Sequence, residues 1–266
     1  MLVCQISDMH VRLPGQLSYG VVDCARMLRA AVAEILRLPQ RPDVVVATGD
    51  LVHAGSVAEY AHLREILAPL SMPVYLIPGN HDEREALRAA FPDHAYLSQS
   101  AGFVQYAIEI WPLRIVALDT VIPGSDAGTL CAERLDWLDA TLAREPRKPT
   151  LVIMHHPPFD TLIDHMDAIG LAEADRFAAV IRKHPQVERV LCGHLHRPIQ
   201  VRFAGTLAST CPSTAHQLGL DLAPHARSFF RMEPPALQLH AWRGGAVVSH
   251  TLPIGDYSGP HRFREM

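Results

Sequence analysis

The chain of 266 residues lacks several features that would place it in a specialised class of protein. Its five cysteines are odd in number and form no C-x-x-C pair, which argues against a disulfide framework and a structural zinc site. No run reaches about 18 consecutive apolar residues and no signal-peptide pattern opens the chain, so we expect neither membrane insertion nor export. The formal charge of −4 and the lack of a dense Lys/Arg block disfavour binding to a nucleic acid polymer. These absences favour a cytoplasmic globular protein.

Short apolar runs rich in Val, Ile and Leu recur along the chain, at residues 2–7, 43–49, 74–79, 114–119, 151–156 and 189–194. Continuous runs of this kind are typical of strands buried on both faces. Segments with helical spacing lie between most of them, at 23–38 with Asp23 as N-cap, at 59–67 and at 132–143. The alternation predicts a largely parallel sheet with covering helices, and the length suits one large α/β domain or two small ones.

Two further segments have the pattern of hairpins. Residues 102–119 predict two strands with a tight connection, and residues 236–252 predict a hairpin centred on Arg243, Gly244 and Gly245. These hairpins favour a second sheet, packed on the first between outer layers of helices. Residues 205–235 are rich in Pro, Ser and Thr with weak periodicity, so we expect an irregular lid, rim or oligomer contact there.

Polar side chains follow five of the six apolar runs at the point where each run ends. They are Asp8 and His10, then Asp50, then Asn80 and His81, then His155, and last His194 and His196. In open α/β sheets the crevice outside the carboxyl ends of the strands is where ligands bind. A His-x-His pair alone is weak evidence for a ligand site in a chain with sixteen histidines. The polar residues at the other strand ends strengthen that evidence. We therefore expect these side chains to meet at one site.

The residue types in this set indicate a metal site. Mixed nitrogen and oxygen donors suit transition ions such as Fe, Mn, Zn or Co better than Ca or Mg. Without His81 the set offers seven ligands, which exceed the needs of one ion, whereas two ions that share a bridging carboxylate would use them all. Two divalent ions with the charges of Asp8 and Asp50 leave a positive excess, which a hydroxide and one phosphodiester anion would neutralise.

The sequence resembles a known family. The ordered pattern Asp8-x-His10, Gly49-Asp50, Gly79-Asn80-His81-Asp82, His155 and Gly193-His194-x-His196 is similar to the signature of calcineurin-like metallophosphoesterases. The stretches VYLIPGNHD, MHHPPF and STCPSTAHQ resemble bacterial class III phosphodiesterases, especially the glycerophosphodiesterase branch. The resemblance implies a four-layer αββα sandwich formed by a single domain over residues 1–266, with 205–235 as a lid or oligomerisation segment and the 236–252 hairpin completing the second sheet.

The resemblance also assigns roles to residues of this chain. Asp8, His10, Asp50 and His196 would hold one metal ion, and Asp50, Asn80, His155 and His194 the other, with Asp50 as the bridge. His81 would lie beside the phosphate, where it stabilises charge or protonates the leaving alkoxide. Asn80 would also contact the substrate, and Tyr19 and His216 occupy positions that the glycerophosphodiesterase branch places near it.

We therefore expect a phosphodiesterase that hydrolyses small phosphodiesters, such as glycerophosphodiesters, by attack of a metal-bound hydroxide on phosphorus. One alternative is a cyclic AMP phosphodiesterase, which would share the metal ligands and differ only at the rim. Another is a non-catalytic scaffold on the same fold, which would be expected to have lost ligands. Leu51, Val52 and His53 stand where protein phosphatases show Asp-Arg-Gly, which counts against that class. The resemblance also implies a homo-oligomer.

The remaining histidines and cysteines are expected to have no part in the site. His156 should point away from it, because its neighbour His155 faces it. The histidines without a supporting pattern are expected at the surface: His53, His62, His94, His165, His184, His225, His240, His250 and His261. Cys4 and Cys192 are expected to be inert buried residues, and Trp137 to belong to a helix core.

Overall fold

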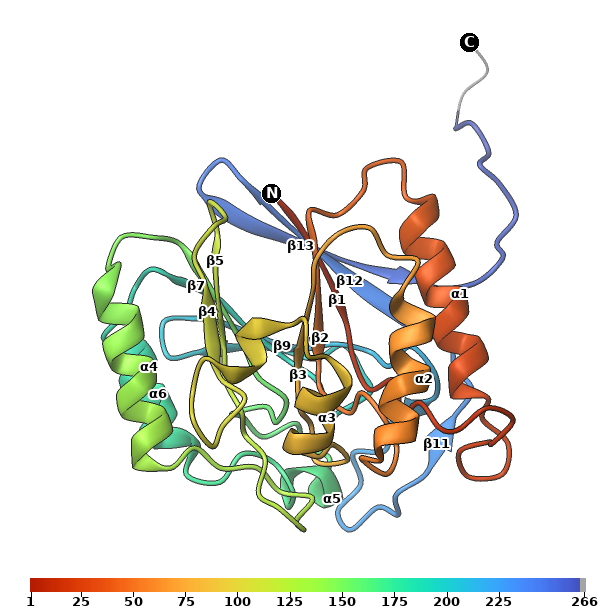
Figure 1. Cartoon of the computed structure of the whole chain (residues 1–266), viewed down its shortest axis with the longest axis horizontal. Helices are drawn as coiled ribbons and strands as arrows, with labels where there is room; N and C mark the ends of the chain where they lie inside the picture. Colours follow the sequence, from red (N-terminus) through yellow and green to blue (C-terminus); the bar gives the residue numbers. More distant parts are fainter. Residues whose placement is uncertain (264–266) are drawn as a thin grey trace.

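The computed structural model describes residues 1–263, in which two sheets lie face to face between two layers of helices (Figure 1). Within these residues the first sheet has five strands, in the order β13 (Ala246–Pro253), β12 (Ala236–Arg243), β1 (Leu2–Ile6), β2 (Val44–Thr48) and β3 (Val74–Ile77). The second has six, in the order β4 (Tyr106–Ile108), β5 (Arg114–Ala117), β6 (Thr150–Ile153), β7 (Val187–Cys192), β9 (Thr206–Thr210) and β8 (Gln200–Phe203). The predicted αββα sandwich is confirmed.

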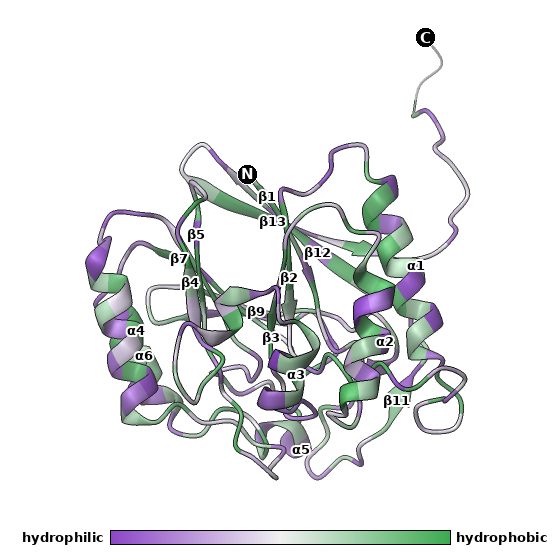
Figure 2. Cartoon of the chain, in the orientation of Figure 1, coloured by the Kyte–Doolittle hydropathy of each residue, from purple (hydrophilic) through white to green (hydrophobic). Residues whose placement is uncertain are grey.

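Helices cover the outer face of each sheet. On one side of the molecule lie α1 (Cys24–Arg37), α2 (Val57–Leu67) and α3 (Arg84–Ala90), and on the other lie α4 (Ala132–Arg144) and α6 (Ala174–Arg182) (Figure 1). The helices turn their hydrophobic sides inward and their hydrophilic sides to solvent (Figure 2). Shorter elements complete the chain: η1 (Ala95–Ser98), α5 (Asp164–Asp167), β10 (Gln217–Leu218) and β11 (Phe230–Arg231).

Local sequence explains where the first two helices begin. Asp23 caps α1, since its carboxylate accepts a hydrogen bond from the backbone N–H of Arg26 at 2.9 Å. Ser56 and Glu59 form a capping box at the start of α2, where each side chain accepts from the backbone N–H of the other. These caps confirm the predicted helix at 23–38 and place the start of the second two residues earlier than its apolar pattern indicated.

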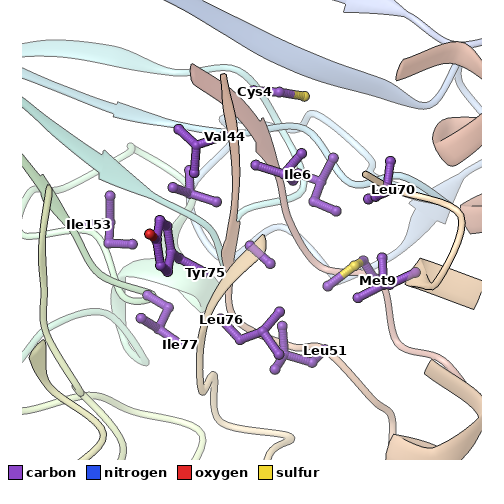
Figure 3. Packing of buried hydrophobic residues seen from close by; sticks show 14 of the residues in the cluster. Cys4, Ile6, Met9, Val44, Leu51, Leu70, Tyr75, Leu76, Ile77 and Ile153 are labelled. Atoms are coloured by element: carbon purple, nitrogen blue, oxygen red, sulfur yellow. The ribbon is translucent and has the colours of Figure 1, made fainter. Parts of the chain in front are cut away.

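The main core fills the space between the two sheets. All residues of β1 and β2 are buried, as their continuous apolar runs predicted. Ile6, Val44 and Tyr75 of the first sheet and Ile153 of the second belong to one cluster of buried side chains (Figure 3). The same cluster includes Ile77, the last residue of β3. The core therefore fixes the positions of strand ends from both sheets relative to one another.

The six apolar runs form strands, but not one sheet. Strands β1, β2 and β3 pair in parallel in the first sheet, whereas β5, β6 and β7 pair in parallel in the second. The prediction that they share one largely parallel sheet was wrong. A parallel neighbour needs a crossover connection that returns the chain to the same end of the sheet. Residues 91–105 instead lead into β4, which pairs antiparallel with β5 and starts a new sheet.

The two hairpins lie on different sheets, and the expectation that the 236–252 hairpin completes the second sheet was wrong, because its strand β12 pairs with β1. The β4–β5 pair belongs to the second sheet, while β12 pairs antiparallel with β1 and carries β13 at the edge of the first. Residues 205–235 are not irregular throughout, because β9 pairs with both β7 and β8. Residues 208–219 are buried, and exposed residues prevail from 220 to 229. Among residues 1–263, no helix combines the length and apolarity needed to cross a bilayer.

Three histidines that we expected at the surface are buried, namely His62, His184 and His240. Each ring has polar partners from distant parts of the chain, and buried polar groups need such partners. His240, for example, lies within hydrogen-bond distance of Gln5 Oε1 at 3.0 Å and of Ser249 Oγ at 2.7 Å. The five cysteines are free thiols, and Cys4 and Cys192 are fully buried, as predicted.

One ion pair joins the two halves of the sandwich. The guanidinium of Arg84, at the start of α3, donates to both carboxylate oxygens of Asp119, which follows β5, at 2.6 and 2.8 Å. Asp119 is fully buried and also accepts backbone N–H bonds from Val104 and Val121. Removing the cation alone would leave a buried carboxylate without its counter-charge.

We expect Arg84→Leu to lower the free energy of unfolding by about 3–5 kcal/mol, because the Asp119 carboxylate stays buried and loses its partner. Urea unfolding followed by circular dichroism measures this change. Arg176→Leu is the matched control, since it removes an exposed pair with Glu173 that contributes at most about 1 kcal/mol. Equal losses in the two variants would contradict the clamping role of Arg84.

Candidate metal centre

The structure brings together all the strand-end residues that the sequence singled out. Asp8 and His10 follow β1, Asp50 follows β2, and Asn80 and His81 follow β3, all in the first sheet, whereas His155 follows β6 and His194 and His196 follow β7 in the second. Their side chains meet at the end of the sandwich where α5 and β11 also lie (Figure 1). The site therefore straddles both sheets.

Sharp backbone turns direct these side chains into the site. Asp8, His10, Asp50, His194 and His196 all have positive φ angles, of 52°, 43°, 48°, 71° and 48°. Residues with a Cβ seldom adopt this left-handed region, and each instance costs roughly 1–3 kcal/mol, so such strain concentrates at functional sites. A Cβ at Gly79 would overlap the Asp50 carboxylate, and one at Gly49 would overlap the ring of His155. Glycine at these two positions lets the strand ends approach closely.

One group of donor atoms comprises Asp8, His10, Asp50 and His196, whose ligand atoms lie within 4.8 Å of one another. The Nε2 atoms of His10 and His196 are 3.0 Å apart. His10 Nε2 is 3.5 Å from Asp50 Oδ2, and His196 Nε2 is 3.6 Å from Asp8 Oδ1. We refer to these four residues as donor group one.

A second group surrounds the amide oxygen of Asn80. This Oδ1 atom lies 3.0 Å from His155 Nε2 and 3.1 Å from His194 Nδ1. Asp50 Oδ1 lies 3.4 Å from His155 Nε2, while its other oxygen faces His10. Asn80, His155, His194 and Asp50 form donor group two, and Asp50 presents one carboxylate oxygen to each group.

Backbone carbonyls orient two of the imidazoles. His155 Nδ1 lies 2.8 Å from the carbonyl oxygen of Thr48, and His196 Nδ1 lies 2.9 Å from that of His216. A carbonyl only accepts hydrogen bonds, so Nδ1 carries the proton in each ring. The lone pair of each neutral ring is then on Nε2, which faces the donor groups. Histidine ligands of metals are held in this way.

The donor set fits a pair of cations. Asp8 is fully buried, and within residues 1–263 its Oδ2 atom has no hydrogen-bond partner. The facing Nε2 atoms of His10 and His196 bring two ring nitrogens together beside two carboxylates. An uncompensated arrangement of this kind is costly in a buried site, and cations between the donors would satisfy it.

The pKa values follow from burial and mutual charge in the site. Burial lowers the pKa values of His10 and His194 well below 6.5, which keeps both rings in the neutral form that binds metals. Burial alone would also lower the pKa of His155, but the charge and hydrogen bond of Asp50 raise it to about 9. Burial opposes ionisation of Asp50 as well, yet His155 and His10 hold its pKa well below 3.8. Metal binding to donor group two would therefore release a proton from His155.

A cavity of about 540 Å³ opens above the donor groups, and His81, Tyr19 and His216 line it together with Phe230. Ring centroids lie 5.3 Å apart for Tyr19 and His216, and 5.2 Å apart for Tyr19 and Phe230 and for His216 and Phe230. These three rings form one aromatic wall. The Nδ1 atom of His81 lies 2.7 Å from the carbonyl oxygen of His53. The four residues that the resemblance placed near the substrate, namely Asn80, His81, Tyr19 and His216, all line this cavity.

Sequence reasoning missed one residue beside the cavity and two that line it. His53, which we expected at the surface, is only partly exposed, and its ring lies 5.3 Å from that of His81 and 5.8 Å from that of Tyr19. Its position three residues after Asp50 was an available signal. Phe229 and Phe230 line the cavity, and their adjacency in the sequence was a further available signal.

His156 lies close to donor group two, with its ring 4.6 Å from that of His194. Both of its nitrogens have other partners, because Nδ1 lies 2.7 Å from Thr120 Oγ1 and Nε2 lies 3.0 Å from the carbonyl oxygen of Asp126. Burial lowers its pKa to about 3. The ring is therefore neutral and hydrogen-bonded outside the donor groups, but it does not point away from the site as we expected.

Comparisons with known proteins agree with this geometry. The family model described as calcineurin-like phosphoesterase matches residues 1–198. A probable glycerophosphodiester phosphodiesterase of Arcobacter nitrofigilis is 37% identical over 265 residues, which cover 99% of this chain and 97% of the relative. A probable cyclic nucleotide phosphodiesterase of Rhodopseudomonas palustris is 36% identical over 260 residues, covering 96% and 93%. The fold is similar to that of a dimetal phosphatase from Danio rerio, with a TM-score of 0.68, 18% identity and coverage of 96% and 99%.

We expect His194→Ala and His196→Ala each to reduce the amount of metal bound, because each removes one donor. Loss of a residue that supports a ligand typically weakens metal affinity about 10–100-fold, and loss of the ligand itself should weaken it more. Metal analysis of protein purified without chelator and reconstituted with Mn, Co or Zn measures the effect. His250→Ala is the control, because this exposed ring lies on β13, outside both donor groups. Full metal content in both variants would show that the pair is not part of the site.

Proposed function

Because the chain belongs to the calcineurin-like phosphoesterase family, we propose that it hydrolyses small phosphodiesters, with glycerophosphodiesters as its substrates. Family membership and relatives named phosphodiesterases support a metal-dependent phosphodiester hydrolase. The observation that carries the proposal is the candidate binuclear site, in which Asp50 offers one oxygen to each of two donor groups. Two-ion sites of this type are used to hydrolyse phosphate esters.

The two donor groups provide the ligands for the ions. Donor group one would hold one ion and donor group two the other, with Asp50 as the bridge. When bound, the ions lower the pKa of a water molecule and screen negative charge on the phosphoryl oxygens. Mixed nitrogen and oxygen donors accept Fe, Mn, Zn or Co, so metal availability would decide which ions are present.

His81 is suited to act on the phosphate. Burial opposes protonation of its ring, but the charge of Asp50 and the hydrogen bond to the His53 carbonyl raise its pKa above 6.5. With the Nδ1 proton held by that carbonyl, Nε2–H of the protonated ring is available to a phosphoryl oxygen or to the leaving alkoxide. Asn80 lines the same cavity beside it.

The aromatic wall would contact the alcohol parts of the substrate. Tyr19, His216 and Phe230 stand at the side of the cavity, and burial holds the pKa of His216 at about 3, so its ring is neutral. A neutral aromatic surface suits a small uncharged group such as glycerol, whose hydroxyls would find partners on Tyr19 and His216. The same surface would also accept a purine by stacking, which keeps cyclic AMP as the competing substrate.

The experiment that tests the function is hydrolysis by metal-reconstituted enzyme. We expect turnover of bis(p-nitrophenyl) phosphate and faster turnover of glycerophosphoethanolamine than of cyclic AMP, both measured as kcat/KM. A marked preference for cyclic AMP would overturn the choice of substrate. Fewer than two bound ions with no hydrolysis of any diester would overturn the function itself.

The same assay includes His81→Gln. This variant should retain its metal and lose about 10²–10⁴-fold in kcat, which is the usual contribution of a general acid or base. His250→Gln is the control and should keep wild-type turnover, because the exposed ring lies outside the cavity.

We also propose that the protein is a cytoplasmic homo-oligomer that uses residues 205–235 as a contact. Free thiols suit a reducing compartment, and Leu220, Leu222 and Met232 are each more than half exposed. Light scattering after gel filtration should give a multiple of the 29.4 kDa chain mass, and Leu220→Lys with Leu222→Lys should shift it toward one chain. Val248→Lys on β13 is the control. A wild-type mass of one chain would refute the oligomer.

A further inference from the structure

The loop formed by residues 213–217 lies beneath donor group one. It connects β9 to β10, and every one of its residues is buried. It contributes a single side chain, that of His216, to the cavity wall. Of the other side chains, that of Ser213 bonds to the backbone of a metal-site residue, and that of Gln217 bonds to the backbone of the loop itself.

Ser213 holds the backbone at Asp8. Its hydroxyl donates to the carbonyl oxygen of Asp8 at 2.7 Å and accepts from the N–H of Ala215 at 2.9 Å. Next to it, the N–H of Thr214 donates to the carbonyl of Ser7 at 3.3 Å. Asp8 has a left-handed φ of 52°, a conformation that persists only where its surroundings fix it. The loop supplies part of that restraint.

The same loop orients His196. The carbonyl oxygen of His216 is the acceptor for Nδ1 of His196, at 2.9 Å, and this bond directs Nε2 toward Asp8 and His10. Two of the four members of donor group one therefore depend on a single loop of five residues. In donor group two, His155 is oriented instead by the carbonyl of Thr48 in β2.

Gln217 keeps the loop closed. Its Oε1 atom accepts from the N–H of Ser213 at 3.2 Å, and its Nε2 atom donates to the carbonyl of Ser213 at 2.8 Å. Gln217 is 3% exposed and contacts neither Asp8 nor His196 through these bonds. Its side chain thus fixes the distance between the residue that holds Asp8 and the carbonyl that orients His196.

We propose that the 213–217 loop is the positioning element of one metal site only, the site of donor group one, with Ser213 and Gln217 as its positioning residues. The inference rests on the proposed two-ion function. It predicts that damage to the loop weakens the binding of one ion and leaves the binding of the other unchanged. General destabilisation of the fold would weaken the binding of both ions. Supporting residues of this kind typically change metal affinity about 10–100-fold.

The test is metal binding by Ser213→Ala, measured by titration of the metal-free protein with Co²⁺ and by metal analysis after dialysis. One of the two ions should bind about 10–100-fold more weakly, and the second should bind as in wild type. Gln217→Met, which keeps the side-chain length, should show the same selective loss. Ser209→Ala is the matched control, because it removes a buried serine hydroxyl from β9 and leaves the loop intact.

Double variants identify which ion is affected. In His196→Ala, the added change Ser213→Ala should cause little further loss of metal, because both changes act on donor group one. In His155→Ala, which weakens the ion of donor group two, the added change Ser213→Ala should remove the remaining ion. Thermal unfolding of the metal-free variants checks that the fold is retained.

The assignment would be overturned if both ions bound equally more weakly, or if both Ser213→Ala and Gln217→Met bound metal as the wild type does. A wild-type protein that binds fewer than two ions would overturn the proposed function and this assignment with it.

Discussion

The structure depends on the burial of acceptor atoms that face one another in a single cleft. The carboxylates of Asp8 and Asp50 are withdrawn from solvent, and the ring nitrogens of His10 and His196 meet between them at 3.0 Å. Such a cluster would be unstable if it relied on its own hydrogen bonds, since within residues 1–263 Asp8 Oδ2 has none. Its stability is therefore tied to the cations that these donors suit. The fold supplies the rest by holding the two buried carboxylates and the imidazoles close together, and this requires rigid support from several directions.

That support comes from the two-sheet architecture. Donors at the ends of β1, β2 and β3 face donors at the ends of β6 and β7, so the site exists only while the sheets keep their relative position. The shared core between the sheets and the Arg84–Asp119 ion pair maintain this position. The left-handed turns at Asp8, Asp50 and His194 store local strain that packing of the sandwich offsets. The stability of the core and the placement of the metal donors therefore depend on the same packing.

The sequence predicted the donors better than their surroundings. A polar residue at the end of an apolar run is a local signal, which is why Asp8, Asp50 and His155 could be identified without knowing which sheet each strand joins. The hairpin pattern at 102–119 indicated a second sheet, but it did not show that the parallel strands β5, β6 and β7 belong to that sheet. The burial of His62, His184 and His240 depends on partners far along the chain, such as Gln5 for His240. Phe230 of the aromatic wall escaped prediction for the same reason, because it meets Tyr19 and His216 only after folding.

The metal donors and the cavity wall come from different parts of the architecture. Under the proposed function, the residues for hydrolysis would therefore be separate from those for substrate selection. The donors stand at strand ends, whereas Tyr19, His216 and Phe230 come from the loops and short strands at the rim. Changes in these rim segments would alter the shape and polarity of the wall and leave the donor groups in place. Relatives named for glycerophosphodiesters and for cyclic nucleotides are nearly equally similar to this chain, so overall identity does not choose between these substrates. Under the proposed function, the choice falls to the neutral aromatic wall, which would meet the non-phosphate part of the substrate beside donors that suit either one.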